Sequence, residues 1–375
     1  MLTRRRTVAL VAAAMSAGPA ASAKPNAPII VNSLGNLWDP NISMGEKAAI
    51  RPGGRILEVD DRVIADAKAA RLSAINITVG YASGSDDPYQ STAASLDRWD
   101  ALIAANASDL LKVARPSDFH RASAEGKIGL IYGFQNSVQV GEHLDRVDEY
   151  ARRGVRVIQL TYNDINMMGG GSAGPENVPL SPLGVKLVQR LNQAKIMVDL
   201  SHSGRQTCLD ALAVSEAPIS INHTGCRALA DLPRNKTDEE LRGVAEKGGY
   251  VGIFFMPYLA LDGRPRASDA ADHIVHALKV CGEDHVGIGT DGTPTPIDDL
   301  KAFRVMMAKD YQARVSAGVA TKGESVDNYP FLIELTGPDQ YRTIVRLLRK
   351  RGLSSRVIEK VLGLNFINYA KRVWA

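Results

Sequence analysis

Three stretches of this chain read IMVDLSH at residues 196–202, PISINH at 218–223 and HVGIGTD at 285–291. Each is a short apolar run that ends in a polar side chain, namely His202, His223 or Asp291. Short runs that are almost continuously apolar are typical of parallel strands buried on both faces. Polar residues that follow parallel strands converge on one rim of the sheet, and a (β/α)8 barrel carries its chemistry on that rim.

The rest of the chain repeats the same pattern. Helix-like segments separate the strand-like runs, and strands that alternate with helices predict a parallel sheet. The segment from Ile297 to Ala375 has more helical pattern than one barrel repeat needs. We therefore predict an α/β protein of the (β/α)8 TIM-like class with additional C-terminal helices. The eight predicted strands are Ile29–Ser33, Ala74–Val79, Ile128–Phe134, Val155–Thr161, Ile196–Ser201, Pro218–Asn222, Tyr250–Phe255 and His285–Thr290.

Helix start signals lie between these strands. Ser181 before Pro182 is typical of an N-cap and a first helical position. Thr237 and Glu240 have the spacing of a capping box, in which each side chain bonds the other residue's backbone N–H. Ser268 predicts the start of a later helix. These signals support the alternation of strands and helices.

The N-terminus has the pattern of an export signal. Arg4–Arg6 precede the apolar stretch Val8–Met15, and the small residues Ala21–Ala23 follow it. This order predicts a cleavable signal over residues 1–23, and the adjacent arginines resemble a twin-arginine signal. We expect residues 24–375 to form one barrel domain that is exported, for example to the periplasm.

Composition narrows the set of partners. The chain has 375 residues, 45% of them hydrophobic, and a net charge of +4, which falls to +1 when the three arginines of the signal are removed. Such a weak charge without basic runs gives no indication of nucleic-acid binding. After the signal, no apolar run is long enough to span a bilayer. The three cysteines, Cys208, Cys226 and Cys281, fit no zinc-binding spacing and are interpreted as small buried residues.

The strand ends suggest a metal-assisted hydrolytic site. His202 and His223 follow consecutive strands, which lie about 5 Å apart in a sheet, so their imidazoles can share one metal ion. Asp291 then serves as a general base or as a further ligand. Arg234 suits a substrate carboxylate, although a surface pair with Asp231 is the alternative. Tyr162 either donates a hydrogen bond to a developing oxyanion or packs.

Several of these motifs together resemble the renal or membrane dipeptidase family, which are zinc peptidases with an amidohydrolase-type barrel. The resemblance covers most of residues 28–375. It implies that His202 and His223 bind one zinc ion, that Arg234 holds the C-terminal carboxylate of a dipeptide, and that Asp291 is the catalytic acid/base. Its members usually hold two zinc ions. The motifs are LTYN at 160–163, LSPLG at 180–184, VDLSH at 198–202, INH at 221–223, PRN at 233–235 and HVGIGTD at 285–291.

The chain departs from this family at the other metal ligands. The first strand of the family ends in a His-x-Asp pair, where this chain has Ser33 and Gly35. A bridging glutamate of the family is replaced by Gln135, whose amide offers only a neutral oxygen, and a substrate-facing histidine is replaced by Tyr162.

We therefore expect at most one zinc ion, on His202, His223 and Gln135. The first hypothesis is a dipeptidase-like hydrolase that acts on a small peptide-like substrate. The alternative is a barrel that binds or tailors a ligand by proton transfer without hydrolysis. The sequence leaves the oligomeric state open between a monomer and a homodimer.

Overall fold

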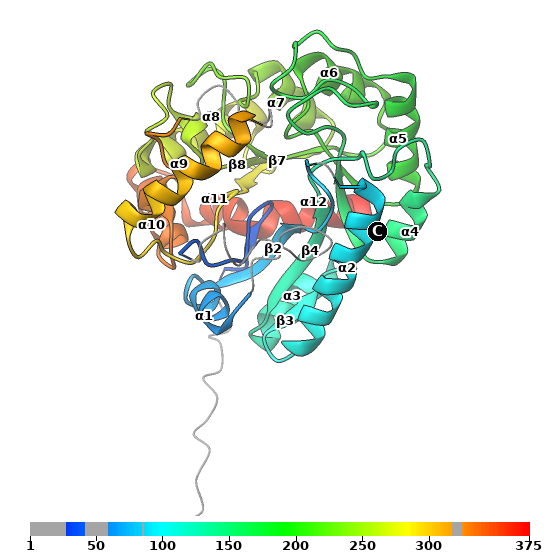
Figure 1. The fold of residues 1–375 in the computed structure, drawn as a ribbon. Helices are drawn as coiled ribbons and strands as arrows, with labels where there is room; N and C mark the ends of the chain where they lie inside the picture. Colours follow the sequence, from blue (N-terminus) through cyan, green and yellow to red (C-terminus); the bar gives the residue numbers. More distant parts are fainter. Residues whose placement is uncertain (1–27, 42–58, 85, 317–324) are drawn as a thin grey trace, which may run out of the picture.

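A computed structural model describes residues 28–41, 59–84, 86–316 and 325–375. The predicted signal at residues 1–23 lies outside these residues. A parallel sheet with the strand order β1-β2-β4-β5-β6-β7-β8-β9 forms the centre of the molecule, and helices surround it (Figure 1). The strands are β1 Ile30–Asn32, β2 Leu72–Thr78, β3 Leu110–Lys112, β4 Ile128–Phe134, β5 Val155–Gln159, β6 Met197–Asp199, β7 Ser220–Thr224, β8 Tyr250–Ile253 and β9 Val286–Ile288.

The first and last strands of this path come together and close the barrel. The backbone N–H of Ser33, directly after β1, donates to the carbonyl oxygen of Ile288 in β9 over 2.9 Å. Asn32 and Thr290 add a reciprocal pair, in which Asn32 Nδ2 donates to Thr290 Oγ1 at 2.8 Å and Thr290 N donates to Asn32 Oδ1 at 2.9 Å. The predicted (β/α)8 fold class is confirmed.

One strand was not predicted. Strand β3 pairs with Ile128–Leu130 at the start of β4, whereas β5 pairs with Tyr132–Phe134 at its end. Two partners thus share one side of β4. Because β3 has only three residues and does not continue the barrel, its sequence carries too little apolar pattern to reveal it.

The helices follow the strands as the sequence predicted, with one correction. Ser181 caps α5, since its Oγ accepts from Gly184 N at 3.0 Å, and Thr237 forms a complete capping box with Glu240 at the start of α7. The start of α8 was predicted wrongly, because its N-cap is Arg266 and not Ser268. The helices are α1 Asp61–Ala69, α2 Pro88–Ala105, α3 Ser117–Glu125, α4 Arg146–Arg152, α5 Pro182–Gln193, α6 Arg205–Val214, α7 Asp238–Glu246, α8 Ala267–Cys281, α9 Leu300–Ser316, α10 Gln340–Lys350, α11 Ser355–Glu359 and α12 Asn365–Trp374.

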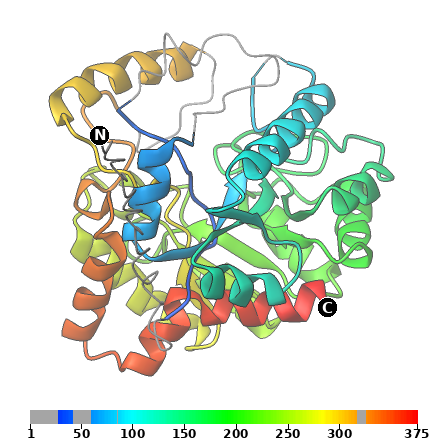
Figure 2. The same cartoon turned by 90° about the horizontal axis from the view of Figure 1, so that it is seen from below.

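The additional C-terminal helices occupy two ends of the barrel. Figure 2 shows α12 along one end and α9 toward the opposite end. Phe366 and Trp374 of α12 pack with Val31, Ala74 and other strand residues in one buried apolar cluster. Helix α12 thus closes the end that lies away from the strand C-termini. No helix of the described segments is long and apolar enough to cross a membrane. All three cysteines are buried, as predicted, and they form no disulfide.

Candidate active site

The two strand-end histidines lie in contact with each other. His202 follows β6, His223 lies within β7, and both imidazoles are buried. Their Nε2 atoms are 3.0 Å apart. The structure therefore places the two predicted ligands where one ion could meet both.

Hydrogen bonds between the strand ends hold this arrangement. Oδ1 of the buried Asp199 accepts from Ser201 Oγ at 2.5 Å and from Asn222 N at 3.0 Å. Ser201 Oγ in turn accepts from His223 N at 3.1 Å. Asp199 and Ser201 thus tie the end of β6 to β7. Burial raises the pKa of the Asp199 carboxyl, and the hydrogen bonds oppose that shift.

The neighbours of His202 fix its tautomer. Arg234 Nη2 lies 3.2 Å from His202 Nε2, and an arginine can only donate, so this Nε2 must be the unprotonated nitrogen. The proton then sits on Nδ1, which donates to Asn163 Oδ1 at 2.7 Å. The ring of Tyr162 stacks on the imidazole with centroids 4.4 Å apart. His202 consequently presents a fixed, neutral Nε2 lone pair.

Arg234 is a buried residue of the site. Only 3% of it is exposed, Nη1 donates to the carbonyl oxygen of Ser201 at 2.8 Å, and the guanidinium lies over the rings of Phe254 and Tyr258. Burial lowers the pKa of Arg234. The alternative of a surface ion pair between Arg234 and Asp231 is wrong, since Asp231 pairs with Arg227 at 2.6 Å.

Asp291 enters the same site from the end of β9, which β8 separates from β7. It follows β9 in a left-handed backbone conformation, with φ 53°, and its N–H donates to the carbonyl oxygen of Leu34 at 2.9 Å. Aspartate is one of the few residues that adopt this conformation readily. Burial raises the pKa of the Asp291 carboxyl to about 6, against the opposing effect of Arg234 and Arg314. A carboxyl with this pKa can exchange a proton near neutral pH.

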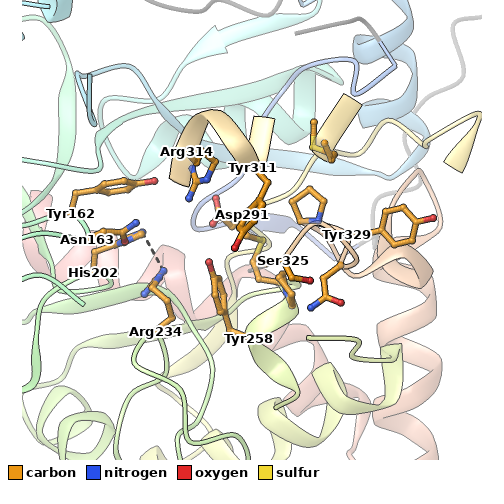
Figure 3. A pocket seen from close by; sticks show the side chains of 15 residues that line it. Tyr162, Asn163, His202, Arg234, Tyr258, Asp291, Tyr311, Arg314, Ser325 and Tyr329 are labelled. Carbon is orange, nitrogen blue, oxygen red and sulfur yellow. Dashed lines mark hydrogen bonds between the residues drawn. The ribbon is translucent and has the colours of Figure 1, made fainter. Parts of the chain in front are cut away.

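These side chains line one cavity of about 220 Å³ (Figure 3). His202, Arg234, Asp291 and Tyr162 all contribute to its wall, as the strand ends predicted. Helix α9 supplies part of the wall as well, through Met307, Tyr311 and Arg314. The sequence analysis missed these residues. Their i, i+4, i+7 spacing places them on one helix face, but it does not indicate that this face lies over the barrel.

Gln135 does not take part in this cavity. Its Nε2 donates to Thr78 Oγ1 at 2.8 Å, at the ends of β4 and β2. The cavity wall does not include it. The structure thus gives no support to the prediction that Gln135 completes a metal site with His202 and His223.

The first strand offers no replacement ligands. Ser33 Oγ lies 2.6 Å from the carbonyl oxygen of Asn222 and 2.9 Å from that of Ile288, and Asn32 bonds to Thr290. Asp39 accepts from Asn41 and Arg62. Among the described residues, no cluster of three or more His, Cys, Asp or Glu side chains could hold a metal ion.

The histidine pair nevertheless fits one zinc ion. Two nitrogens bound to a tetrahedral zinc ion lie about 3.3 Å apart, close to the 3.0 Å between the Nε2 atoms of His202 and His223. Without a metal ion, His223 Nε2 donates to the unprotonated Nε2 of His202, and His223 Nδ1 has no hydrogen-bond partner in the described part of the chain. A second ion would need further anionic ligands, and Asp291 is the only carboxylate among the described residues that line the cavity. The donor set fits one ion on two imidazoles and does not fit two ions.

The chain is similar to known dipeptidases. Residues 61–312 match the model of the membrane dipeptidase family, peptidase family M19. An uncharacterized dipeptidase of Schizosaccharomyces pombe is 31% identical over 257 residues, which are 66% of this chain and 53% of that protein. Dipeptidase verJ of Clonostachys rogersoniana is 30% identical over 62% of each chain. The chain thus spans only about half to three fifths of the length of these relatives.

Solved structures show the same fold. An amidohydrolase from Pseudomonas aeruginosa superposes with a TM-score of 0.75 at 26% identity, over 92% of this chain and 97% of that one. A metallopeptidase from Rhodobacter sphaeroides, solved with a phosphinate mimic of L-Ala-D-Ala, has a TM-score of 0.73 at 18% identity, over 93% of this chain and 100% of that one. From the family match over residues 61–312, we conclude that this chain belongs to the membrane dipeptidase family, M19.

Proposed function

We propose that this chain is an exported hydrolase that cleaves the amide bond of a dipeptide or a small peptide-like molecule, with at most one bound metal ion. One observation carries the proposal: a buried arginine, Arg234, and a carboxyl with a pKa of about 6, Asp291, line the same cavity. The first can bind a substrate carboxylate, and the second can transfer a proton. The family membership and the dipeptidases among its relatives support this class of reaction.

The roles follow from the positions of the side chains. Arg234 would pair with the substrate's carboxylate and so fix the scissile amide in the cavity. Asp291 in its ionised form would take a proton from the attacking water and return it to the leaving amine. Tyr162, stacked on His202, would donate a hydrogen bond to the oxygen that becomes negative. A zinc ion held by His202 and His223 would supply polarisation of the water and the carbonyl.

The test is the zinc content of the protein with residues 24–375, measured by elemental analysis beside its activity on a dipeptide panel. We expect about one zinc ion per chain, which the double variant His202→Ala/His223→Ala loses. His120→Ala is the matched control, because His120 is exposed on α3. Turnover should be well below the roughly 10 s⁻¹ typical of enzymes. Absence of metal from the wild-type protein, or its retention by the double variant, would contradict the proposed site.

Export is part of the proposal and rests on residues 1–23 alone. We expect the full chain to be recovered outside the cytoplasm with an N-terminus at Lys24. Replacement of Arg5 and Arg6 by lysine should retain the protein inside the cell if the signal is of the twin-arginine type. Unchanged export of that variant would contradict this assignment.

A second function is favoured by the amide and hydroxyl groups that stand in place of metal ligands. Ser33, Asn32 and Gln135 are all engaged in hydrogen bonds with protein groups. A barrel with this rim could bind a peptide-like ligand, or transfer protons through Asp291 and Tyr162, without hydrolysis. Ligand binding without amide cleavage, in protein shown to be metal-free, would support this alternative over hydrolysis.

A further inference from the structure

A second arginine faces the cavity from the side opposite Arg234. Met307, Tyr311 and Arg314 lie on one face of α9 and line the cavity. In Figure 3, Arg314 enters from α9, whereas Arg234 enters from the loop after β7, and Asp291 is drawn beside Arg314. The charge of Arg314 opposes the rise in the pKa of the Asp291 carboxyl.

Among the described residues of the cavity wall, positively charged side chains outnumber carboxylates. Its described cationic side chains are Arg234 and Arg314, and its described carboxylate is Asp291. His202 adds no charge, because its Nε2 accepts a hydrogen bond from Arg234. The hydroxyl groups of Tyr162, Tyr258 and Tyr311 point into the space between the arginines and can donate further hydrogen bonds (Figure 3). The wall is consequently matched to a ligand that is rich in anionic oxygen.

We infer that the cavity selects a peptide-like substrate with two carboxylates, of which Arg234 binds one and Arg314 binds the other. This inference rests on the proposed function and names its substrate class. A dipeptide with a neutral side chain is a zwitterion without net charge and leaves the wall positive. A dipeptide with a glutamate or aspartate residue has a net charge of −1 and brings a second carboxylate that Arg314 can bind. Arg314 is then the residue that determines specificity.

The experiment compares matched substrates that differ in one charged group. Ala-Glu and Ala-Gln, and Glu-Ala and Gln-Ala, have nearly equal size, so the ratio of their kcat/KM values isolates the second carboxylate. We expect the wild-type protein to prefer one of the acidic dipeptides by about 10- to 100-fold, the range that a hydrogen bond to a charged group contributes. Arg314→Gln should abolish this preference, because kcat/KM should fall by about 10- to 100-fold more for the acidic dipeptide than for the neutral one.

Three variants separate this role from a general effect on α9. Arg314→Lys should keep part of the preference, because it retains the charge. Lys309→Gln removes a charge from an exposed position of the same helix and should keep the full preference. Arg234→Gln should lower kcat/KM for acidic and neutral dipeptides alike. Equal kcat/KM values for acidic and neutral dipeptides in the wild-type protein, or equal losses on both in Arg314→Gln, would overturn the inference.

A binding measurement distinguishes the failure of this inference from the failure of hydrolysis. Isothermal titration with glutarate and with its mono-amide, glutaramate, needs no turnover. Tighter binding of glutarate that Arg314→Gln abolishes, in protein that cleaves no dipeptide, would support two carboxylate subsites and contradict the proposed hydrolysis. Cleavage without any preference for the acidic dipeptides or for glutarate would support the proposed hydrolysis and contradict the two carboxylate subsites. Lack of both binding and cleavage would overturn both proposals.

Discussion

The two halves of the barrel rim use similar polar residues for different purposes. At the ends of β6 and β7, His202 and His223 direct ring nitrogens toward each other, and His202 and Arg234 line the cavity. At the ends of β1 and β4, Asn32 and Gln135 bond to threonines of the neighbouring strands. The first half places polar side chains in the cavity wall, whereas the second bonds them to neighbouring strands away from the cavity.

The difference shows that a position on the rim does not by itself make a residue catalytic. A strand-end polar group must be hydrogen-bonded when it is buried, and a partner from the next strand is always near. Asn32 and Thr290 exchange two hydrogen bonds and thereby close the barrel. His202 has partners too, but the lone pair on its Nε2 faces the cavity and accepts only from Arg234 and His223.

The largest effect is expected for Asp291→Asn. The amide has nearly the same shape as the carboxyl, but it cannot accept a proton, so the turnover number for dipeptides should fall by about 10²- to 10⁴-fold. Steady-state kinetics on the preferred dipeptide measure the change. The thermal unfolding midpoint should stay within a few degrees, because the replacement keeps the backbone conformation that aspartate and asparagine share.

Asp298→Asn is the matched control for this variant, since Asp298 is an exposed carboxylate that pairs with Arg62. It should leave the turnover number unchanged. If Asp291→Asn kept more than about a tenth of the activity, Asp291 would not be the proton carrier, and the cavity would have to act through another group.

The next effect concerns the half of the rim that serves structure. Gly35→Asp introduces the carboxylate that the related family has on its first strand. A Cβ atom at Gly35 would collide with Asn32 Nδ2 and lie 3.0 Å from the carbonyl oxygen of Gly292. We expect the free energy of unfolding to fall by about 1–3 kcal/mol from overpacking, with no gain in bound zinc. Urea denaturation and elemental analysis are the two measurements.

Gly126→Asp gives a baseline for that comparison, because no atom lies within 4 Å of a Cβ at this helix end. Any fall in the unfolding free energy of Gly126→Asp reflects the left-handed backbone at φ 65° and not a collision. A second zinc ion per chain in Gly35→Asp, with unchanged stability, would mean that the first strand has kept a metal pocket.

The sequence predicts the strand ends well, because each end couples a buried apolar run to a polar residue. This coupling placed His202 and Asp291 in the wall of one cavity and His223 in contact with His202. It also placed Gln135 at the end of a strand, but a sequence does not show which way an amide turns. Gln135 turns to Thr78, and the prediction of a metal ligand at that position gained no support.

Other parts of the site depend on long-range packing that no local pattern encodes. Helix α9 brings Arg314 over the rim, at a distance of 80 residues along the chain from Arg234. The amphipathic spacing of Met307, Tyr311 and Arg314 identifies a helix face, whereas its contact with the cavity arises from the whole tertiary fold. Strand β3 was missed for a related reason, since its three residues pair only with the first half of β4.

The dependence of activity on pH should be smaller than the effect of Asp291→Asn. The Asp291 carboxyl has a pKa raised to about 6, so the ionised form required of a base predominates above that pH and is lost below it. Between pH 7 and pH 5 the ionised fraction, and with it kcat/KM, should fall by about tenfold. Measurement of kcat/KM from pH 4.5 to 8, which reports the groups of the free protein, tests this expectation.

A change in the opposite direction on acidification would indicate that Asp291 acts as an acid in the first step. The variant Asp291→Asn should lack the inflection near pH 6 altogether. If it kept that inflection, the titrating group would be a different one.

The smallest effect is expected for Gln135→Glu, which tests whether the structural half of the rim can be returned to metal binding by one substitution. Gln135 Nε2 donates to Thr78 Oγ1, and a glutamate could instead accept from the same hydroxyl, so the contact would survive with its direction reversed. We expect the unfolding free energy to change by less than about 1 kcal/mol and the zinc content to stay at one ion or fewer per chain.

A carboxylate held in this way by Thr78 remains outside the cavity wall that His202 and Asp291 line, and Ser33 and Gly35 supply no further ligand on the first strand. A second zinc ion in Gln135→Glu would show that residue 135 can turn toward the histidines. The division between the two halves of the rim would then rest on a single amide rather than on the hydrogen bonds that close the barrel.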